Sequence, residues 1–181
     1  MFDRGRCFQQ QLGQLSPVVT VAVLSLVSII TAAAETHKVP PALALGLAYR
    51  ESSLVPTARG DKGERGLFQL MPATARAVGF EGDLDGLFEP SVNAFYGLKH
   101  LAGLLQKYKS IPAAVSAYQH GTPTRENDAY TLDVLAYARR FESSLFFARA
   151  SAVLFPVAVG VAAALFSGFD LEESDSDGRE T

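Results

Sequence analysis

The sequence is poor in cysteine and histidine and has no excess of positive charge, and each shortage excludes a class of protein. Its single cysteine, Cys7, cannot form a disulfide within the chain. The three histidines, without a second cysteine, give no recognisable zinc spacing, so we expect neither a metal nor another cofactor. The net charge of -3 gives no electrostatic footprint for nucleic acid, which we therefore do not expect as a partner.

Strand patterns are also scarce in this chain. No stretch shows sustained alternation of apolar and polar residues between hairpin turns, and no internal repeat is present, so strands should be few. The middle of the chain instead has prolines where helices would begin and glycines where they would end. The pattern predicts helices over residues 40–49, 72–78, 91–108 and 112–119, and from residue 129 onward. We therefore expect a mainly α fold in one domain.

A long apolar stretch near the N-terminus, residues 17–34, contains no charge. About 20 apolar residues span a bilayer and about 7–15 form the core of a signal peptide, so this stretch fits either a membrane anchor or a cleavable signal. Arg4 and Arg6 favour export of the residues after this stretch, and Ala32 and Ala34 supply an A-x-A cleavage pattern. The alternative is a buried core helix, which is less favoured because every face of the stretch is apolar.

A second uncharged stretch, residues 151–169, is nearly of bilayer length and precedes an acidic tail of the kind that stays solvated. Arg139, Arg140 and Arg149 precede it and would prefer the cytoplasmic side, against the export that the first stretch indicates. A peripheral hairpin, the membrane of a virion or dominance of the first segment would each resolve this conflict. We divide the chain into residues 1–35 (signal anchor or signal peptide), 36–148 (water-soluble domain), 149–170 (apolar membrane segment) and 171–181 (acidic tail).

Glu51 stands at the end of an otherwise apolar run, PPALALGLAY. On a helix it lies one turn beyond Leu47 and two beyond Leu43, and so shares their apolar face. Burial there would raise the pKa of its carboxyl and keep it protonated near neutral pH, ready to donate a proton to a leaving oxygen. The alternative is a glutamate at a helix end that turns into solvent and pairs with Arg50 or Arg59.

Four motifs, in order, carry a family resemblance. The stretches ESSLVP and GERGLFQLMPATA match a run of Glu-Ser, Pro and Gly-x-x-Gly-Leu-Met-Gln-Leu-Met-Pro-x-Thr-Ala without an insertion. LFEPSVNAFYGL, AVSAYQHG and ENDAY come next at similar spacing. Together, over about residues 38–141, they resemble the lytic transglycosylase family, whose catalytic domain has a goose-type lysozyme-like helical fold. Any one motif would be weak, but four in order are specific.

The resemblance implies cleavage of the β-1,4 bond between N-acetylmuramic acid and N-acetylglucosamine in peptidoglycan glycan strands. Glu51 would protonate the bridging oxygen and then take the proton of the muramoyl C6 hydroxyl, which attacks C1 of the same sugar. The product is a 1,6-anhydro end, and no water is consumed. An intramolecular nucleophile has a large effective molarity, so the second carboxylate that most glycosidases need can be absent.

The resemblance also implies a set of substrate-binding residues, each with a structural alternative. Gln69 would bond the acetamido or hydroxyl groups of the substrate, or else satisfy nearby backbone. Tyr118 would lie beside Glu51 and orient the acid or the sugar, or else pack in the core. Ser52 would hold the acid or simply bond backbone.

Three more residues complete this set. Gln119 would hold substrate or position the acid, while Glu126 and Tyr130 would line the far part of the groove, with a helix cap as the alternative for Glu126. Gln119 stands where the family usually has Asn, and Phe68 stands where it usually has Met. These departures bear on substrate fit more than on the type of reaction.

Two other functions compete with the transglycosylase. A hydrolase on the same fold would use water and leave a reducing end, and a non-catalytic protein would keep the domain to bind peptidoglycan. A membrane-associated enzyme that opens the wall, with its domain facing the periplasm or cell wall, suits a phage particle, with or without a lipid layer in its virion. A conjugation or secretion apparatus is the other setting that it suits. The two apolar ends favour the phage, and general wall turnover is the default.

Overall fold

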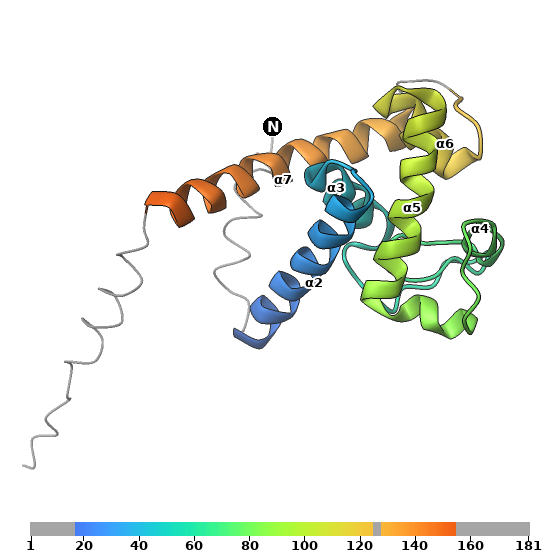
Figure 1. Cartoon of the computed structure of the whole chain (residues 1–181), viewed down its shortest axis with the longest axis horizontal. Helices are drawn as coiled ribbons and strands as arrows, with labels where there is room; N and C mark the ends of the chain where they lie inside the picture. Colours follow the sequence, from blue (N-terminus) through green and yellow to red (C-terminus); the bar gives the residue numbers. More distant parts are fainter. Residues whose placement is uncertain (1–16, 125–127, 155–181) are drawn as a thin grey trace, which may run out of the picture. The chain divides into compact units, whose positions relative to one another are not determined.

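The computed structural model of the chain describes residues 17–124 and 128–154, with side chains over 22–124 and 128–143. Its elements are α2 (Pro17–Thr36), α3 (Pro41–Ser52), α4 (Pro72–Ala77), the 3-10 helix η1 (Leu84–Phe88), α5 (Pro90–Tyr108), α6 (Ile111–His120) and α7 (Ala129–Leu154) (Figure 1). The chain divides into two units after Ser143, and the side chains described here belong to the first. The expected mainly α fold is confirmed, and β pairing among the described residues is limited to isolated bridges in the loop after α3.

Proline begins most of the helices of the domain. A proline occupies one of the first two positions of α3, α4, α5 and α6, where its missing N–H would have no partner within the helix. Gly121 ends α6 with a φ of +78°, and its N–H bonds the carbonyl of Ala117 at 2.8 Å. The five helices expected from the sequence are therefore present, whereas η1 was not expected.

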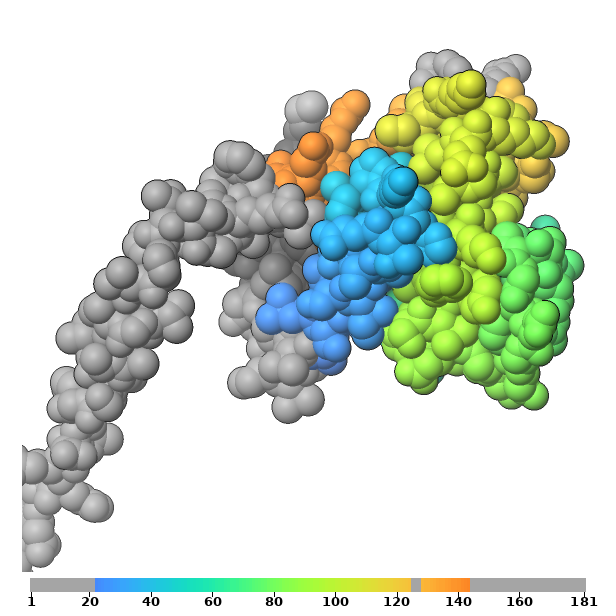
Figure 2. Space-filling model, viewed as in Figure 1, coloured from blue at the N-terminus to red at the C-terminus, as the bar shows by residue number. Residues whose placement is uncertain are grey.

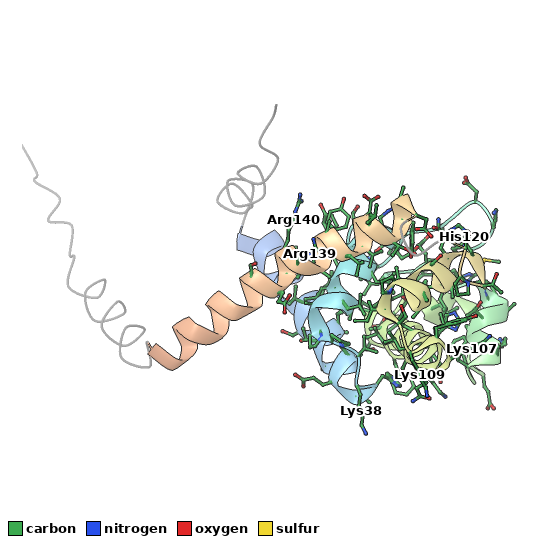
Figure 3. The ribbon with its side chains drawn as sticks, turned by 90° about the horizontal axis from the view of Figure 1, so that it is seen from above. Lys38, Lys107, Lys109, His120, Arg139 and Arg140 are labelled. Atoms are coloured by element: carbon green, nitrogen blue, oxygen red, sulfur yellow. The ribbon has the colours of Figure 1, made fainter. Side chains whose placement is uncertain are left out.

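Helix α5 lies in the centre of the domain, with α6 and η1 packed against it and α4 beside it (Figure 1). Leu98 and Leu101 of α5 and Val115 of α6 have no exposed surface. Leu98 and Leu101 are three positions apart and therefore lie on one apolar face of α5. This face shares a core with Val115 of α6. The exposed Lys107 and Lys109 at the end of α5 complement the negative end of its dipole (Figure 3).

Helix α2 packs against α3 and α5, as the adjoining blue and yellow-green surfaces of Figure 2 also show. Ile30 and Ala34 are fully buried, and the ring of His37, just after α2, lies 4.6 Å from the ring of Phe95 on α5. Such contacts were expected only if the first apolar stretch were a core helix. No helix among the described residues is both long enough and apolar enough to cross a membrane. The second apolar stretch from residue 155 onward, the acidic tail, and residues 1–16 lie outside the described residues.

The crossing of α3 and α7 sets the distance between the two helices that carry Glu51 and Tyr130. A Cβ added to Gly46 of α3 would lie 2.7 Å from the backbone nitrogen of Ala138 and 2.7 Å from the carbonyl oxygen of Val134. The two backbones therefore approach as closely as a glycine allows.

We predict that Gly46→Ala forces α3 and α7 apart and lowers the free energy of unfolding by about 1–3 kcal/mol, the usual effect of overpacking. Gly103→Ala is the matched control, because a Cβ at this exposed position of α5 would meet nothing within 4 Å. It should instead raise stability by about 0.5–1 kcal/mol through helix propensity. Urea denaturation of both variants checks this, and equal stability changes in the two would show that the close crossing does not exist.

Candidate active site

Glu51 occupies the last turn of α3 on the face that Leu43 and Leu47 bury in the core. Leu43 is 4% and Leu47 0% exposed. Glu51 itself is partly buried, and this desolvation raises the pKa of its carboxyl above the ordinary 4.5. The environment expected from helical spacing is thus confirmed: burial shifts the acid toward its protonated form.

Tyr130 is the direct partner of this carboxyl. Its hydroxyl donates a hydrogen bond to Oε1 of Glu51, and the tyrosine is only 5% exposed. Burial and the negative charge of Glu51 raise the pKa of Tyr130, so its hydroxyl keeps its proton and remains a donor. The bond in turn lowers the pKa of Glu51, offsetting part of the desolvation. We expected Tyr130 in the far part of the groove, and the structure instead places it at the acid, because the first turn of α7 folds back on the end of α3.

Two further charges act on Glu51. Arg50 lowers the pKa of its carboxyl and Glu64 raises it, each through its charge. The ion pair that the structure gives Arg50 goes to Asp133, with 3.1 Å between Nε and Oδ2, and that of Arg59 goes to Asp85 at 3.5 Å. The alternative in which Glu51 turns into solvent and pairs with an arginine is therefore not what the structure shows.

Gln69 lies in the loop that follows α3, with a left-handed φ of +42°. Its Nε2 donates to the carbonyl oxygens of Gly66 at 2.8 Å and Ala58 at 3.1 Å. The alternative role, satisfying nearby backbone, is thus observed. Contact with a sugar stays a prediction.

Ser52 ties the end of α3 to the same loop. It is 8% exposed, and its hydroxyl lies 2.9 Å from the carbonyl oxygen of Leu67 and 3.1 Å from that of Ala48. Of the two roles considered for Ser52, the structure shows the backbone one. By joining helix and loop, this residue places Gln69 relative to the acid.

Tyr118 approaches the site from α6. Its hydroxyl donates to the carbonyl oxygen of Phe68 at 2.9 Å, and its ring lies 5.2 Å from that of His100. Burial and, to a lesser extent, the negative charge of Glu51 raise the pKa of Tyr118. The alternative role of Tyr118, packing with its hydroxyl satisfied, is thus observed, and the residue lies near enough to the acid to feel its charge. That Tyr118 orients the acid or the sugar stays a prediction.

The remaining expected residues are placed less centrally. Gln119 is exposed at the end of α6, and Glu126 lies outside the described residues. Phe68, expected in a groove wall, is fully buried. A Cβ at Gly97 would lie 2.6 Å from the Cβ of Phe68, so the absence of a side chain at Gly97 on α5 leaves the space that Phe68 occupies.

The aspartates of the loops have structural partners. Asp83 accepts from the N–H of Asp85 at 2.7 Å and so caps η1. Asp85 pairs with Arg65 at 2.5 Å. Among the described residues, no group of three histidine, cysteine or acidic side chains is arranged to hold a metal ion.

Comparison with known proteins identifies the domain. The family model described as "Transglycosylase SLT domain" matches residues 28–132 of the chain. The chain belongs to the transglycosylase SLT domain family. It is 34% identical over 93 residues to a transglycosylase of Enterobacteria phage PRD1, covering 51% of this chain and 34% of that protein.

Solved structures show the same fold at lower identity. An inactive mutant of the lytic transglycosylase Slt from Pseudomonas aeruginosa matches with a TM-score of 0.60 and 22% identity, over 65% of this chain and 24% of that chain. The 70 kDa soluble lytic transglycosylase of Escherichia coli matches with a TM-score of 0.57 and 20% identity, over the same shares. The SLT chain therefore spans about a third of its phage relative and about a quarter of each solved chain. The family and the lysozyme-like helical fold expected from the motifs are confirmed.

Two residues that support the SLT site had no role assigned from the sequence. Asn93 is fully buried on α5, where its Oδ1 accepts from the N–H of Phe68 at 2.8 Å and its Nδ2 donates to the carbonyls of Arg65 and Leu87 at 2.8 and 2.7 Å. It thereby fixes the loop that carries Gln69. The available signal was its place as the polar residue on the otherwise apolar buried face of the helix.

Asp128 is the second such residue, and it fixes the start of α7. Its carboxylate accepts from the N–H of Thr131 at 2.6 Å and from the hydroxyls of Ser116 and Thr124 at 2.7 and 3.3 Å. Burial would raise the pKa of Asp128, but these hydrogen bonds prevail and lower it to about 2. An aspartate directly before a helix is a capping signal, and here it sets the position of Tyr130 two residues later.

We predict that Tyr130→Phe raises the pKa of Glu51, because it removes a hydrogen bond that stabilises the carboxylate while burial continues to oppose ionisation. Titration of the Glu51 carboxyl carbon by NMR measures the change. Tyr118→Phe is the control, since the hydroxyl of Tyr118 bonds the carbonyl of Phe68 instead. A pKa that falls in Tyr130→Phe, or moves equally in both variants, would contradict the placement of Tyr130.

Proposed function

We propose that this SLT domain is a peptidoglycan lytic transglycosylase that cleaves the bond between N-acetylmuramic acid and N-acetylglucosamine and leaves a 1,6-anhydro-muramoyl end. The observation that carries this proposal is the partly buried carboxyl of Glu51, held by Tyr130 with a raised pKa. A general acid must be protonated when the substrate arrives, and a raised pKa increases the fraction of Glu51 that is protonated at any given pH.

The proposed reaction uses one carboxyl in two roles. Glu51 donates its proton to the bridging oxygen as the C1–O bond breaks and positive charge develops at C1. The carboxylate that results then takes the proton of the muramoyl C6 hydroxyl while the oxygen of that hydroxyl forms a bond to C1. The proton lost in the first step is regained in the second, so no water is consumed.

Tyr130 has a distinct part in this cycle. Its bond to Oε1 is a hydrogen bond to the charged form of the acid, so it stabilises the carboxylate that appears after the first proton transfer. Burial alone would disfavour the ionised form of Glu51 and so oppose release of its proton. The hydrogen bond from Tyr130 reduces the free-energy difference between the protonated and the ionised form. Contacts of Ser52, Gln69, Tyr118, Gln119 and Glu126 with the glycan remain part of the proposal.

Comparison with relatives adds support. The Pseudomonas structure is of an Slt variant, described as inactive, in which a glutamine replaces a glutamate. That an amide in place of a carboxyl inactivates a lytic transglycosylase is consistent with a single essential acid.

A hydrolase is the second candidate, and the observation that favours it is the charge of Glu64 near Glu51. The charge of Glu64 acts on Glu51, so a second carboxylate lies within electrostatic range of the acid. Glycosidases that use water need such a second carboxylate. The nature of the new sugar end distinguishes the two reactions.

We further propose that the enzyme opens the cell wall locally for a phage, with its domain facing the periplasm or wall. The likeness to the PRD1 transglycosylase supports the phage setting, and a conjugation or secretion apparatus is the alternative. The uncharged residues 151–169 support membrane association, whereas Ile30 and Ala34 of the first apolar stretch are buried in the core.

We predict that the full chain releases 1,6-anhydro-muropeptides from purified sacculi, and that Glu51→Gln lowers this release by about 10²–10⁴-fold, the usual contribution of general acid–base catalysis. Mass spectrometry of the soluble products measures both. The full chain is used because α2 contributes buried residues to the core.

Glu81→Gln is the matched control, because it makes the same chemical change at an exposed loop position. It should release products at the wild-type rate, and circular dichroism should show all three proteins folded. Reducing ends from the wild type would establish the hydrolase instead. Binding to sacculi without any product would indicate the non-catalytic protein.

A further inference from the structure

Arg50 and Asp133 join α3 to α7 immediately beside the acid. Nε of Arg50 lies 3.1 Å from Oδ2 of Asp133, and the guanidinium carbon of Arg50 lies 5.2 Å from the centre of the Tyr130 ring. Arg50 precedes Glu51 in the sequence, and Asp133 follows Tyr130 by three residues, which is one helical turn. The end of α3 and the start of α7 are therefore connected twice, by the ion pair and by the hydrogen bond.

We propose that Arg50 and Asp133 form a positioning pair that holds Tyr130 on Glu51 and sets the pH range over which the acid works. The inference rests on the proposed role of Glu51 as proton donor. Neither residue of the pair touches the reacting atoms, since both act through Tyr130 and through their charges.

The ion pair between Arg50 and Asp133 is too weak to contribute much to folding stability, which favours a positioning role. The side chains are 38% and 54% exposed, and an ion pair in such a place contributes only about 0–1 kcal/mol to folding. Its geometry is nevertheless specific, because the guanidinium lies over one face of the Tyr130 ring while its Nε is held by the carboxylate. A tyrosine constrained in this way has fewer orientations in which its hydroxyl misses Oε1.

The charges around Glu51 give the pair a second effect. The groups that face this carboxyl are Tyr130 from α7, Tyr118 from α6, Arg50 from α3 and Glu64 from the loop. The positive charge of Arg50 lowers the pKa of Glu51, and Asp133 offsets part of that charge. Removing Arg50 should therefore raise the pKa of Glu51 for two reasons, because its positive charge is lost and Tyr130 is held less firmly. Removing the charge of Asp133 leaves the charge of Arg50 more effective but also loosens Tyr130, so its two effects on the pKa of Glu51 oppose each other.

The test is the pH dependence of sacculus digestion by full-length Arg50→Gln, Asp133→Asn and the double variant. Because the acid must be protonated, activity falls as pH rises through the pKa of Glu51. We expect this fall to move to higher pH in Arg50→Gln and to move less in Asp133→Asn, where the two effects oppose each other. Near the optimum, kcat should fall by up to about fivefold in each single variant with KM unchanged, the equivalent of 1 kcal/mol.

Arg139→Gln is the control, because it removes the same charge from an exposed position further along α7 (Figure 3). Its pH profile should match that of the wild type. A fall that moves to lower pH or not at all in Arg50→Gln, or that moves further in Asp133→Asn than in Arg50→Gln, would overturn the proposal, as would losses that simply add in the double variant. NMR titration of Glu51 in the same variants tests these unequal pKa changes even if the wild type proves inactive, so failure of the pair and failure of the proposed function remain distinguishable.

Discussion

The site depends on a carboxyl held at the edge of an apolar helix face by a single hydroxyl. Burial of Glu51 beside Leu47 favours its protonated form, and the bond from Tyr130 favours its charged form. A group caught between these opposed effects can release a proton and regain it, which one-carboxyl chemistry requires. The close crossing of α3 and α7 at Gly46 makes this pairing possible, because the acid and the tyrosine come from helices far apart in the sequence.

The loop after α3 is held in place mainly by side chains that bond to its backbone. Asn93, Ser52 and Tyr118 all bond carbonyl or N–H groups between Arg65 and Phe68, and Gln69 bonds carbonyls of the same loop. Polar side chains from α3, α5 and α6 thus converge on one short segment. Under the proposed function, a loop that is already fixed beside the acid would need little further ordering to bind a glycan.

Local patterns in the sequence predicted local structure well. Prolines at helix starts indicated α3, α4 and α6, and the helical spacing of apolar residues indicated α5. The spacing of Leu43, Leu47 and Glu51 indicated the environment of the acid. The place of Tyr130 could not be predicted, because it depends on how α7 crosses α3. The packing of α2 also differs from the favoured interpretation: an apolar stretch suits a protein core and a membrane equally, and only the contacts of Ile30 show that part of it lies in the core.

The acid also carries a cost in stability that its chemistry requires. Because the fold raises the pKa of Glu51, the carboxyl supports folding below its ordinary pKa of 4.5, and this support is lost as pH rises through the folded value. The most direct test is NMR titration of the Glu51 carboxyl in the full chain. We predict a pKa above 4.5, and a value at or below 4.5 with a freely hydrated carboxylate would contradict the role of Glu51 as the acid.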